Sequence, residues 1–236
     1  MGVTFKRKKK KNLLLSLIYR LNKIPILSKK KKFELLLNLE WIFERLVHEM
    51  SFDLYNETKH PLRIYTNAFL FNFIKPEDSV LDLGCKYGEI SAAIAEKVKR
   101  VVGVDFDKIA IDKANSSYKR NNLSFVTGDA LIYLKNNTEK FNVLILSHIL
   151  EHIEEPKKML LDFKPFVQYM FIELPDFDKT YLNHYRKDFN CELIYSDPDH
   201  IFEFDRIELI NLIKDCELEI LSSEYRFGVQ RYWLKT

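Results

Sequence analysis

Three aspartates stand at the ends of short apolar segments: Asp82 in V-L-D-L, Asp105 in V-V-G-V-D and Asp129 in F-V-T-G-D. Ligands of a parallel sheet bind outside the carboxyl ends of its strands, so these side chains would face one ligand. Asp82 could meet an ammonium group or a water molecule. Asp105 could accept both hydrogen bonds of a ribose diol, and Asp129 could accept one from an exocyclic amine. The spacing therefore predicts a nucleoside site.

A glycine-bounded turn follows the first of these segments, in G-C-K-Y-G at residues 84–88. Gly84 and Gly88 remove side chains where backbone amides and the next helix N-terminus would face the ligand. Phe106 lies beside Asp105 and could pack on the face of an adenine ring. The turn and its neighbours therefore predict close contact between the backbone and a small ligand.

Histidines supply the groups that could remove a proton. His148 and His152 follow the fourth apolar segment, and in a helix their spacing would put both imidazoles on one face. His200 lies in S-D-P-D-H-I-F-E-F-D (196–205). Imidazole suits general base catalysis at neutral pH, so all three are candidate catalytic residues. Alternatively, Glu151 and His152 form a packing and hydrogen-bonding unit, and His200 holds its loop through a backbone carbonyl.

Strand and helix patterns alternate from residue 79 onward, which predicts a doubly wound α/β sheet. The predicted strands are 79–83, 100–105, 123–127, 141–147 and 169–173, and the predicted helices are 89–97, 108–119, 156–163 and 205–216. Two last strands, 218–225 and 230–235, are separated by a short connection that contains Gly228. We expect them to form an antiparallel hairpin that completes a Rossmann-like sheet of seven strands.

The N-terminal region differs sharply in charge from the rest of the chain. Residues 1–32 hold 12 of the 37 Lys and Arg residues and no acidic residue, whereas the remainder holds all 34 Asp and Glu residues. Apolar residues at helical spacing predict a helix over 33–50, and after a polar break at 51–60 Pro61 opens another to about residue 74. We divide the chain into a basic amphipathic extension (1–32), a helical cap (33–74) and a catalytic domain (75–236).

Lysine clusters at 6–11 and 29–32 bracket the apolar segment 13–27. Such a segment could lie on an anionic membrane surface, bind nucleic-acid phosphates, or be a solvated extension. Nucleic acid is the less favoured partner, because aromatic residues are scarce there. No run of about 18 apolar residues predicts a transmembrane helix. Three scattered cysteines without C-x-x-C spacing favour reduced thiols, and we expect a cytoplasmic protein, peripheral at the inner membrane face.

The motifs around the three aspartates resemble the class I S-adenosylmethionine-dependent methyltransferases. The matching blocks are V-L-D-L-G-C-K-Y-G (80–88), V-V-G-V-D-F-D (101–107), F-V-T-G-D-A (125–130) and F-N-V-L-I-L-S-H-I-L-E-H-I-E-E-P (141–156). This resemblance implies that S-adenosylmethionine is the cofactor. Gly84 and Gly88 would approach its methionine part, Asp105 its ribose, and Asp129 with Ala130 its adenine; Asp82, Phe106 and Ser147 complete the expected cofactor set.

Two departures from the family pattern bear on the site. The middle glycine that is usual in the first loop is Lys86 here, which predicts an altered cofactor affinity. The block L-E-H-I resembles a subgroup that acts on small molecules, lipids and glycans. In some of those relatives a glutamate three residues before the Glu-His pair joins it in binding a divalent metal. His148 occupies that position, so the sequence leaves a metal requirement open.

The resulting prediction is a methyltransferase that modifies an oxygen of a small hydroxylated acceptor, such as a glycan or a lipid-linked sugar. A nicotinamide-dependent dehydrogenase is disfavoured, because two of the three glycines of G-x-G-x-x-G are Lys86 and Glu89. An RNA methyltransferase that uses the basic N-terminus, or a catalytically silent binding module of the same fold, remains an alternative.

Overall fold

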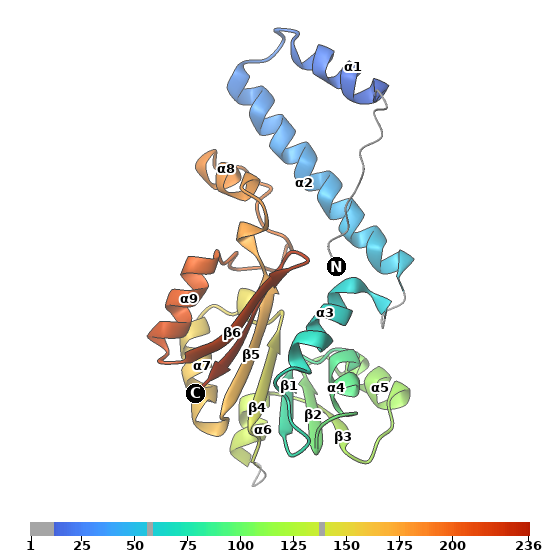
Figure 1. Cartoon of the computed structure of the whole chain (residues 1–236), viewed down its shortest axis with the longest axis vertical. Coiled ribbons are helices and arrows are strands. Elements are labelled where there is room, and N and C mark those ends of the chain that lie inside the picture. Colours follow the sequence, from blue (N-terminus) through green and yellow to red (C-terminus); the bar gives the residue numbers. More distant parts are fainter. Residues whose placement is uncertain (1–11, 56–58, 137–139) are drawn as a thin grey trace.

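The computed structural model describes residues 12–55, 59–136 and 140–236. Its centre is a seven-stranded sheet of order β3-β2-β1-β4-β5-β7-β6, in which β7 runs in the opposite direction to the other six strands (Figure 1). The strands are β1 (Ser79–Leu83), β2 (Arg100–Asp105), β3 (Leu123–Thr127), β4 (Val143–Ser147), β5 (Tyr169–Pro175), β6 (Glu219–Arg226) and β7 (Val229–Lys235). The chain order reverses between β1 and β4, which is where ligands of such sheets bind.

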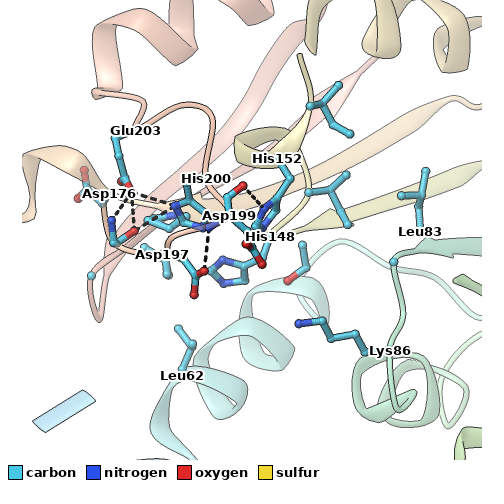
Figure 2. A pocket seen from close by; sticks show the side chains of 18 of the residues that line it. Leu62, Leu83, Lys86, His148, His152, Asp176, Asp197, Asp199, His200 and Glu203 are labelled. Carbon is cyan, nitrogen blue, oxygen red and sulfur yellow. Dashed lines mark hydrogen bonds and ion pairs between the residues drawn. The ribbon is translucent and has the colours of Figure 1, made fainter. Parts of the chain in front are cut away.

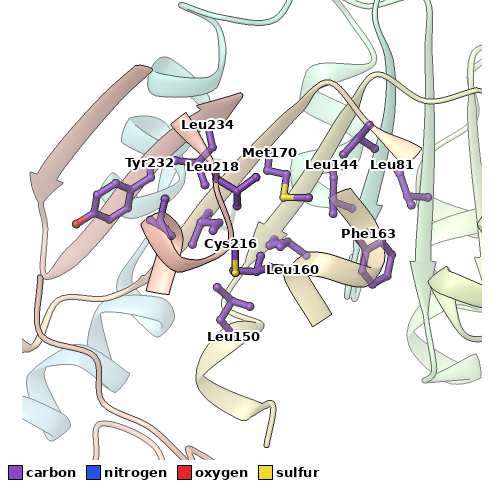
Figure 3. Close-up of a cluster of buried hydrophobic side chains, with 14 of the residues drawn as sticks. Leu81, Leu144, Leu150, Leu160, Phe163, Met170, Cys216, Leu218, Tyr232 and Leu234 are labelled. Carbon is purple, nitrogen blue, oxygen red and sulfur yellow. The ribbon is translucent and has the colours of Figure 1, made fainter. Parts of the chain in front are cut away.

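Helices cover both faces of this sheet. The larger apolar cluster packs one face against α6 (Ala130–Asn136), α7 (Pro156–Phe163) and α9 (Arg206–Asp215), and Figure 3 shows part of it around Leu144 and Met170. The other face carries α3 (Pro61–Leu70), α4 (Glu89–Ile94) and α5 (Lys108–Ser117). Because β4 is buried on both faces, it reads V-L-I-L rather than alternating with polar residues.

Two helices precede this domain and extend away from the sheet in Figure 1: α1 (Leu13–Asn22) and α2 (Lys29–Leu54). Ser28 begins α2 by accepting a hydrogen bond from the backbone of Lys31. The middle of α2 contacts α8 (Leu182–Asp188), where the buried Arg186 guanidinium binds the Leu37 carbonyl and the Glu40 carboxylate. No helix in the described part of the chain is long and apolar enough to cross a membrane.

The predicted seven-stranded sheet with its terminal hairpin is confirmed. The hairpin is tighter than predicted, since only Phe227 and Gly228 connect its strands, both with positive φ (57° and 73°), as primed turns require. The start of the polar break predicted over 51–60 was wrong, because α2 continues to Leu54, whereas the next helix begins at Pro61 as predicted. Helix α2 also crosses the proposed boundary at 32/33. The Lys6–Lys11 cluster lies outside the described residues.

Candidate functional site

A cavity of about 1340 Å³ opens at the carboxyl ends of β1, β2 and β4, at the point where the chain order reverses. Its wall includes most of the residues that the sequence singled out: Asp82, Gly84, Asp105, Phe106, Asp129, Ala130, Ser147, His148, His152 and His200. The volume exceeds the ~300–1,000 Å³ typical of one small-molecule site. The cavity therefore has room for two molecules side by side.

The first loop is shaped by residues in left-handed backbone conformations. Gly84 has φ +69°, and a Cβ added there would lie 2.2 Å from Cδ1 of Ile149. Lys86 has φ 45°, which explains why glycine is the usual residue at its position. Gly88 is not among the cavity-lining residues; its φ is +83°, and an added Cβ would lie 2.4 Å from the Phe125 ring. The structure thus gives Gly88 a packing role at the start of α4.

Asp105 is held firmly by backbone amides. Its Oδ2 accepts a hydrogen bond of 2.8 Å from the Lys86 amide, and its Oδ1 accepts one of 2.8 Å from the Asp107 amide. These bonds tie the end of β2 to the first loop and fix the carboxylate at the cavity wall. Phe106, which follows, is 75% exposed and also lines the cavity. Its ring is therefore available to a flat ligand.

Asp129 is positioned by the helix that follows it. Its Oδ1 accepts a hydrogen bond of 2.8 Å from the Ile132 amide in the first turn of α6. Next to it, Ala130 is buried and lines the cavity, while a Cβ added to Gly128 would meet no atom within 4 Å. The segment after β3 therefore presents a small, open surface with one fixed carboxylate.

Asp82 lies deepest among the three aspartates. It is 2% exposed, and its Oδ2 accepts a hydrogen bond of 2.5 Å from the Ser91 hydroxyl. Burial raises the pKa of Asp82 to about 6, an effect that the Ser91 hydrogen bond only partly opposes. The side chain can thus change its charge near neutral pH when a cation approaches.

Behind Ser147 lies a buried polar network that sequence reasoning missed. Glu173 on β5 is fully buried and accepts hydrogen bonds from Ser147 Oγ (2.8 Å), Thr66 Oγ1 (2.6 Å) and Arg231 Nε (2.5 Å). Burial opposes ionisation of Glu173. A protonated His148 and the Arg231 guanidinium, together with the hydrogen bonds from Thr66 and Ser147, outweigh it and hold the pKa of Glu173 below its usual range. The sequence did offer one indication of this buried carboxylate, because Glu173 stands inside the apolar segment F-I-E-L-P.

His148 and His152 do not share a helical face, contrary to the condition set in the sequence analysis. His148 has φ 56°, and only Leu150–His152 form a single 3-10 turn. The two rings line the same cavity but take different partners. His148 Nδ1 lies 3.1 Å from Glu151 Oε1, and its Nε2 lies 3.7 Å from Glu173 Oε1.

His152 instead contacts His200, whose segment folds back over the 3-10 turn. The two ring centroids are 4.7 Å apart, and Figure 2 shows them on the same side of the cavity as His148. His200 Nδ1 lies 2.8 Å from Glu203 Oε1. Burial alone would lower the pKa of His200, but the hydrogen bond and charge of Glu203 raise it overall. Glu203 was not singled out from the sequence, although it stands three residues after His200.

Helix α2 supplies the outer wall of the cavity. Trp41, His48 and Phe52 line it, and Arg45 anchors the helix to the carbonyl of Ser196 and the carboxylate of Asp197. The sequence predicted a helical cap over 33–74, without identifying these side chains. Around the whole cavity, carboxylates outnumber Lys and Arg side chains by more than two to one.

S-adenosylmethionine matches the inner part of this cavity. The loop at Gly84 lacks a side chain where a Cβ could not fit, so its backbone is open to a ligand. Asp105 is placed for a ribose, the segment at Asp129 for an adenine, and the excess of carboxylates suits a positively charged sulfonium. These assignments of individual residues remain predictions.

A family model described as a methyltransferase domain matches residues 56–223, more than two thirds of the chain. The chain is 33% identical over 123 residues to the ribosomal protein L11 methyltransferase of Staphylococcus epidermidis, covering 48% of this chain and 38% of the relative. It is 35% identical over 97 residues to an uncharacterized RNA methyltransferase of Mycoplasma mobile, covering 39% of this chain and 27% of that relative. The chain thus spans less than half the length of these curated relatives.

Solved structures show the same fold. The magnesium protoporphyrin IX methyltransferase from Synechocystis, with bound SAH, has a TM-score of 0.57 at 18% identity and covers 82% of this chain and 93% of that one. The match to the family model, the strand order and the reversed last strand agree with the motifs recognised in the sequence. The chain therefore belongs to the class I S-adenosylmethionine-dependent methyltransferases, and S-adenosylmethionine is its methyl donor.

Proposed function

We propose that this methyltransferase modifies a hydroxyl oxygen of a small polyhydroxylated acceptor, with a glycan or a lipid-linked sugar as the favoured class. The observation that carries the proposal is that three imidazoles line one cavity that is larger than one ligand needs, two of them in contact with each other. His148, His152 and His200 come from two separate segments of the chain. A hydroxyl must lose its proton during methylation, and imidazole is suited to accept it.

Residues of the inner cavity would hold the cofactor. Asp105 would accept hydrogen bonds from the ribose, and Asp129 with Ala130 would contact the adenine, on which Phe106 could pack. Asp82, Gly84 and Ser147 would border the methionine part. When bound, S-adenosylmethionine supplies a methyl group on a positively charged sulfur, whose neutral thioether is the leaving group.

Residues of the outer cavity support a polyol as the acceptor. Trp41 and Phe52 offer flat apolar surfaces, and the carboxylates of Glu44, Asp197 and Glu203, which also line the cavity, could accept hydrogen bonds from hydroxyls besides their present partners. The same carboxylates would repel the phosphates of a nucleic acid. This composition favours a neutral, hydroxyl-rich acceptor over RNA.

His148 is the group that we place as proton acceptor for the acceptor hydroxyl. Two buried carboxylates, Glu151 and Glu173, lie beside its ring and would stabilise the positive charge that it gains. As the oxygen–methyl bond forms and the sulfur–methyl bond breaks, the hydroxyl proton would pass to the imidazole. The outer wall of the cavity would hold the acceptor so that its hydroxyl oxygen lies close to the methyl carbon of the cofactor.

Incubation with a radiolabelled methyl donor and separated lysate fractions (lipid, glycan, RNA, protein) tests the proposal. We expect label in the glycan or lipid-linked sugar fraction, lost with His148→Gln and retained with His184→Gln, whose side chain lies outside the cavity. Label confined to RNA or protein would contradict the proposed acceptor class. If no fraction is labelled while the demethylated cofactor binds, the chain is a silent binding module.

Methylation of RNA or of a ribosomal protein is the second candidate. Its support is that the relatives named above are a ribosomal protein L11 methyltransferase and an RNA methyltransferase, although they match over only part of their own length. The basic N-terminus could then hold an RNA backbone. RNA binding that falls steeply with salt, and disappears on removal of residues 1–28, would favour this candidate.

We further propose that α1 and the start of α2 bind the cytoplasmic face of an anionic membrane. Every residue of α1 is exposed, including Leu13, Leu14 and Leu17, and Lys29–Lys32 begin the next helix. Exposed leucines beside a lysine cluster combine the apolar and electrostatic contributions to surface binding. In this proposal residues 1–32 are the anchor, 33–74 the cap and 75–236 the catalytic domain.

A further inference from the structure

The structure assigns a divalent transition-metal site to Glu151, His152 and His200. Each of these residues offers one ligand atom, and the three atoms lie within 4.8 Å of one another. Two ligands of one bound zinc ion are at most about 4 Å apart, given bonds of ~2.0–2.2 Å. An ion could therefore be bound after side-chain movements of about 1 Å or less.

The hydrogen bonds of both histidines leave the correct nitrogen available. His152 Nδ1 lies 3.1 Å from the carbonyl oxygen of Asp199, which can only accept, so Nδ1 carries the hydrogen. His200 Nδ1 lies 2.8 Å from Glu203 Oε1. In both rings Nε2 then has a free lone pair. Metal-binding histidines are usually oriented in this way, by donating their other ring hydrogen to a carbonyl or a carboxylate.

The side chain of Glu151 provides an independent indication of a cation site. Its side chain is 1% exposed, and Oε1 lies 3.1 Å from His148 Nδ1. Its other oxygen, Oε2, is buried and has no hydrogen-bond partner among the described residues. A buried carboxylate oxygen without a partner destabilises the fold, and a bound cation would remove that cost.

Backbone contacts hold the distant histidine in place beside the other two ligands. The amides of Ile201 and Phe202 both donate to the carbonyl oxygen of Glu151, at 2.8 Å and 3.1 Å. His200 is thus fixed relative to the 3-10 turn that carries Glu151 and His152. The site joins the segment after β4 to the segment before α9 in the absence of any ion.

The donor set indicates which ions would bind. Two imidazole nitrogens and one carboxylate suit Zn²⁺, Co²⁺ or Mn²⁺, whereas Mg²⁺ and Ca²⁺ prefer oxygen ligands alone. Three protein ligands leave coordination positions open. Since His152 and His200 both line the cavity, those positions would face it, where a hydroxyl of an acceptor could bind. Ion binding itself does not depend on the acceptor, so this inference and the proposed function can fail separately.

Metal binding can be measured directly on the full chain after treatment with a chelator. We expect one Co²⁺ per chain with visible absorption bands, one Zn²⁺ by calorimetry, and a rise in the thermal unfolding midpoint when Zn²⁺ is added. Glu151→Gln, His152→Gln and His200→Gln should each weaken Zn²⁺ binding at least tenfold. His184→Gln, which alters an exposed histidine of α8, should bind like the unchanged protein.

The Glu151→Gln variant, whose side chain has nearly the same shape, also distinguishes a loss of metal binding from a loss of folding. Without metal it should be at least as stable as the unchanged protein, because it removes a buried charge. With Zn²⁺ it should gain no stability. Absence of Co²⁺ bands and of binding heat in the unchanged protein, or equal Zn²⁺ affinity in Glu151→Gln, would overturn the assignment. Binding of the demethylated cofactor, measured on the same samples, reports separately on the methyltransferase site.

Discussion

Asp82 is a buried carboxyl whose surroundings oppose its ionisation, and its pKa is raised to about 6. The folded chain therefore holds this proton more tightly than the unfolded chain does, where the pKa is about 3.9. The contribution of this bound proton to the free energy of unfolding is fully present below about pH 4. It is lost as the pH rises through 6.

Asp82→Asn should abolish this loss, since asparagine cannot ionise and its side-chain oxygen can still accept from Ser91. The difference in unfolding free energy between the variant and the unchanged protein should be about 1–2 kcal/mol more in favour of the variant at pH 7.5 than at pH 5. Urea unfolding at both pH values measures the difference. Asp112→Asn, at an exposed position on α5, is the control and should show no such trend. A constant difference for Asp82→Asn would contradict the raised pKa.

Lys86 holds a backbone conformation (φ 45°) that costs a non-glycine residue about 1–2 kcal/mol. Lys86→Gly should relieve this cost, partly offset by the greater entropy of glycine in the unfolded chain, and stabilise the fold by up to about 1 kcal/mol. Lys86→Ala removes the ammonium group but keeps the strain, so it separates the two effects. Chemical unfolding that shows equal stability for the glycine and alanine variants would exclude backbone strain as the cause.

At the scale of elements, the Glu173–Arg231 pair connects β5 to β7, and Thr66 connects both to α3. Both charged side chains are fully buried, so removal of one leaves an uncompensated charge. Arg231→Met should therefore cost roughly 3–5 kcal/mol of unfolding free energy. Glu173→Gln in the same chain should restore much of it.

A double-mutant cycle by urea unfolding checks this coupling. The matched surface pair is Lys108 with Asp112, exposed neighbours on α5 that should contribute less than about 1 kcal/mol. Additive effects of Arg231→Met and Glu173→Gln would show that the buried pair does not act as a unit.

The sequence predicted the bounds of β1, β2 and β3 as the structure has them, because each strand is an apolar run that ends at an acid or a turn. It missed α6, which begins directly at Ala130 after the T-G-D turn, and α8, in a region where no helix was predicted. Glu173 and Glu203 were missed because their importance comes from partners distant in sequence or from burial. The acid within F-I-E-L-P indicates a buried carboxylate, but no local pattern identifies Arg231, 58 residues away, as its partner.

Considered as a whole, the molecule places its exposed apolar helix at the end farthest from the sheet, beyond the outer wall of the cavity (Figure 1). Removal of residues 1–28 should abolish sedimentation with anionic liposomes and leave affinity for the demethylated cofactor unchanged. Leu13→Ser combined with Leu17→Ser should weaken liposome binding at least tenfold without altering the lysine clusters. Equal sedimentation of the truncated and full chains would contradict the membrane proposal, and a concentration-dependent dimer lost on truncation would assign α1 to self-association.

We propose that the cavity at the carboxyl ends of β1, β2 and β4 binds the nucleoside of S-adenosylmethionine through Asp105 and Asp129. Calorimetric titration of the demethylated cofactor measures this binding, with Asp105→Asn beside the control Asp112→Asn. We expect one site per chain in the unchanged protein and in the control, with affinity at least tenfold lower in Asp105→Asn. Equal affinity in all three proteins would exclude the proposed role of Asp105.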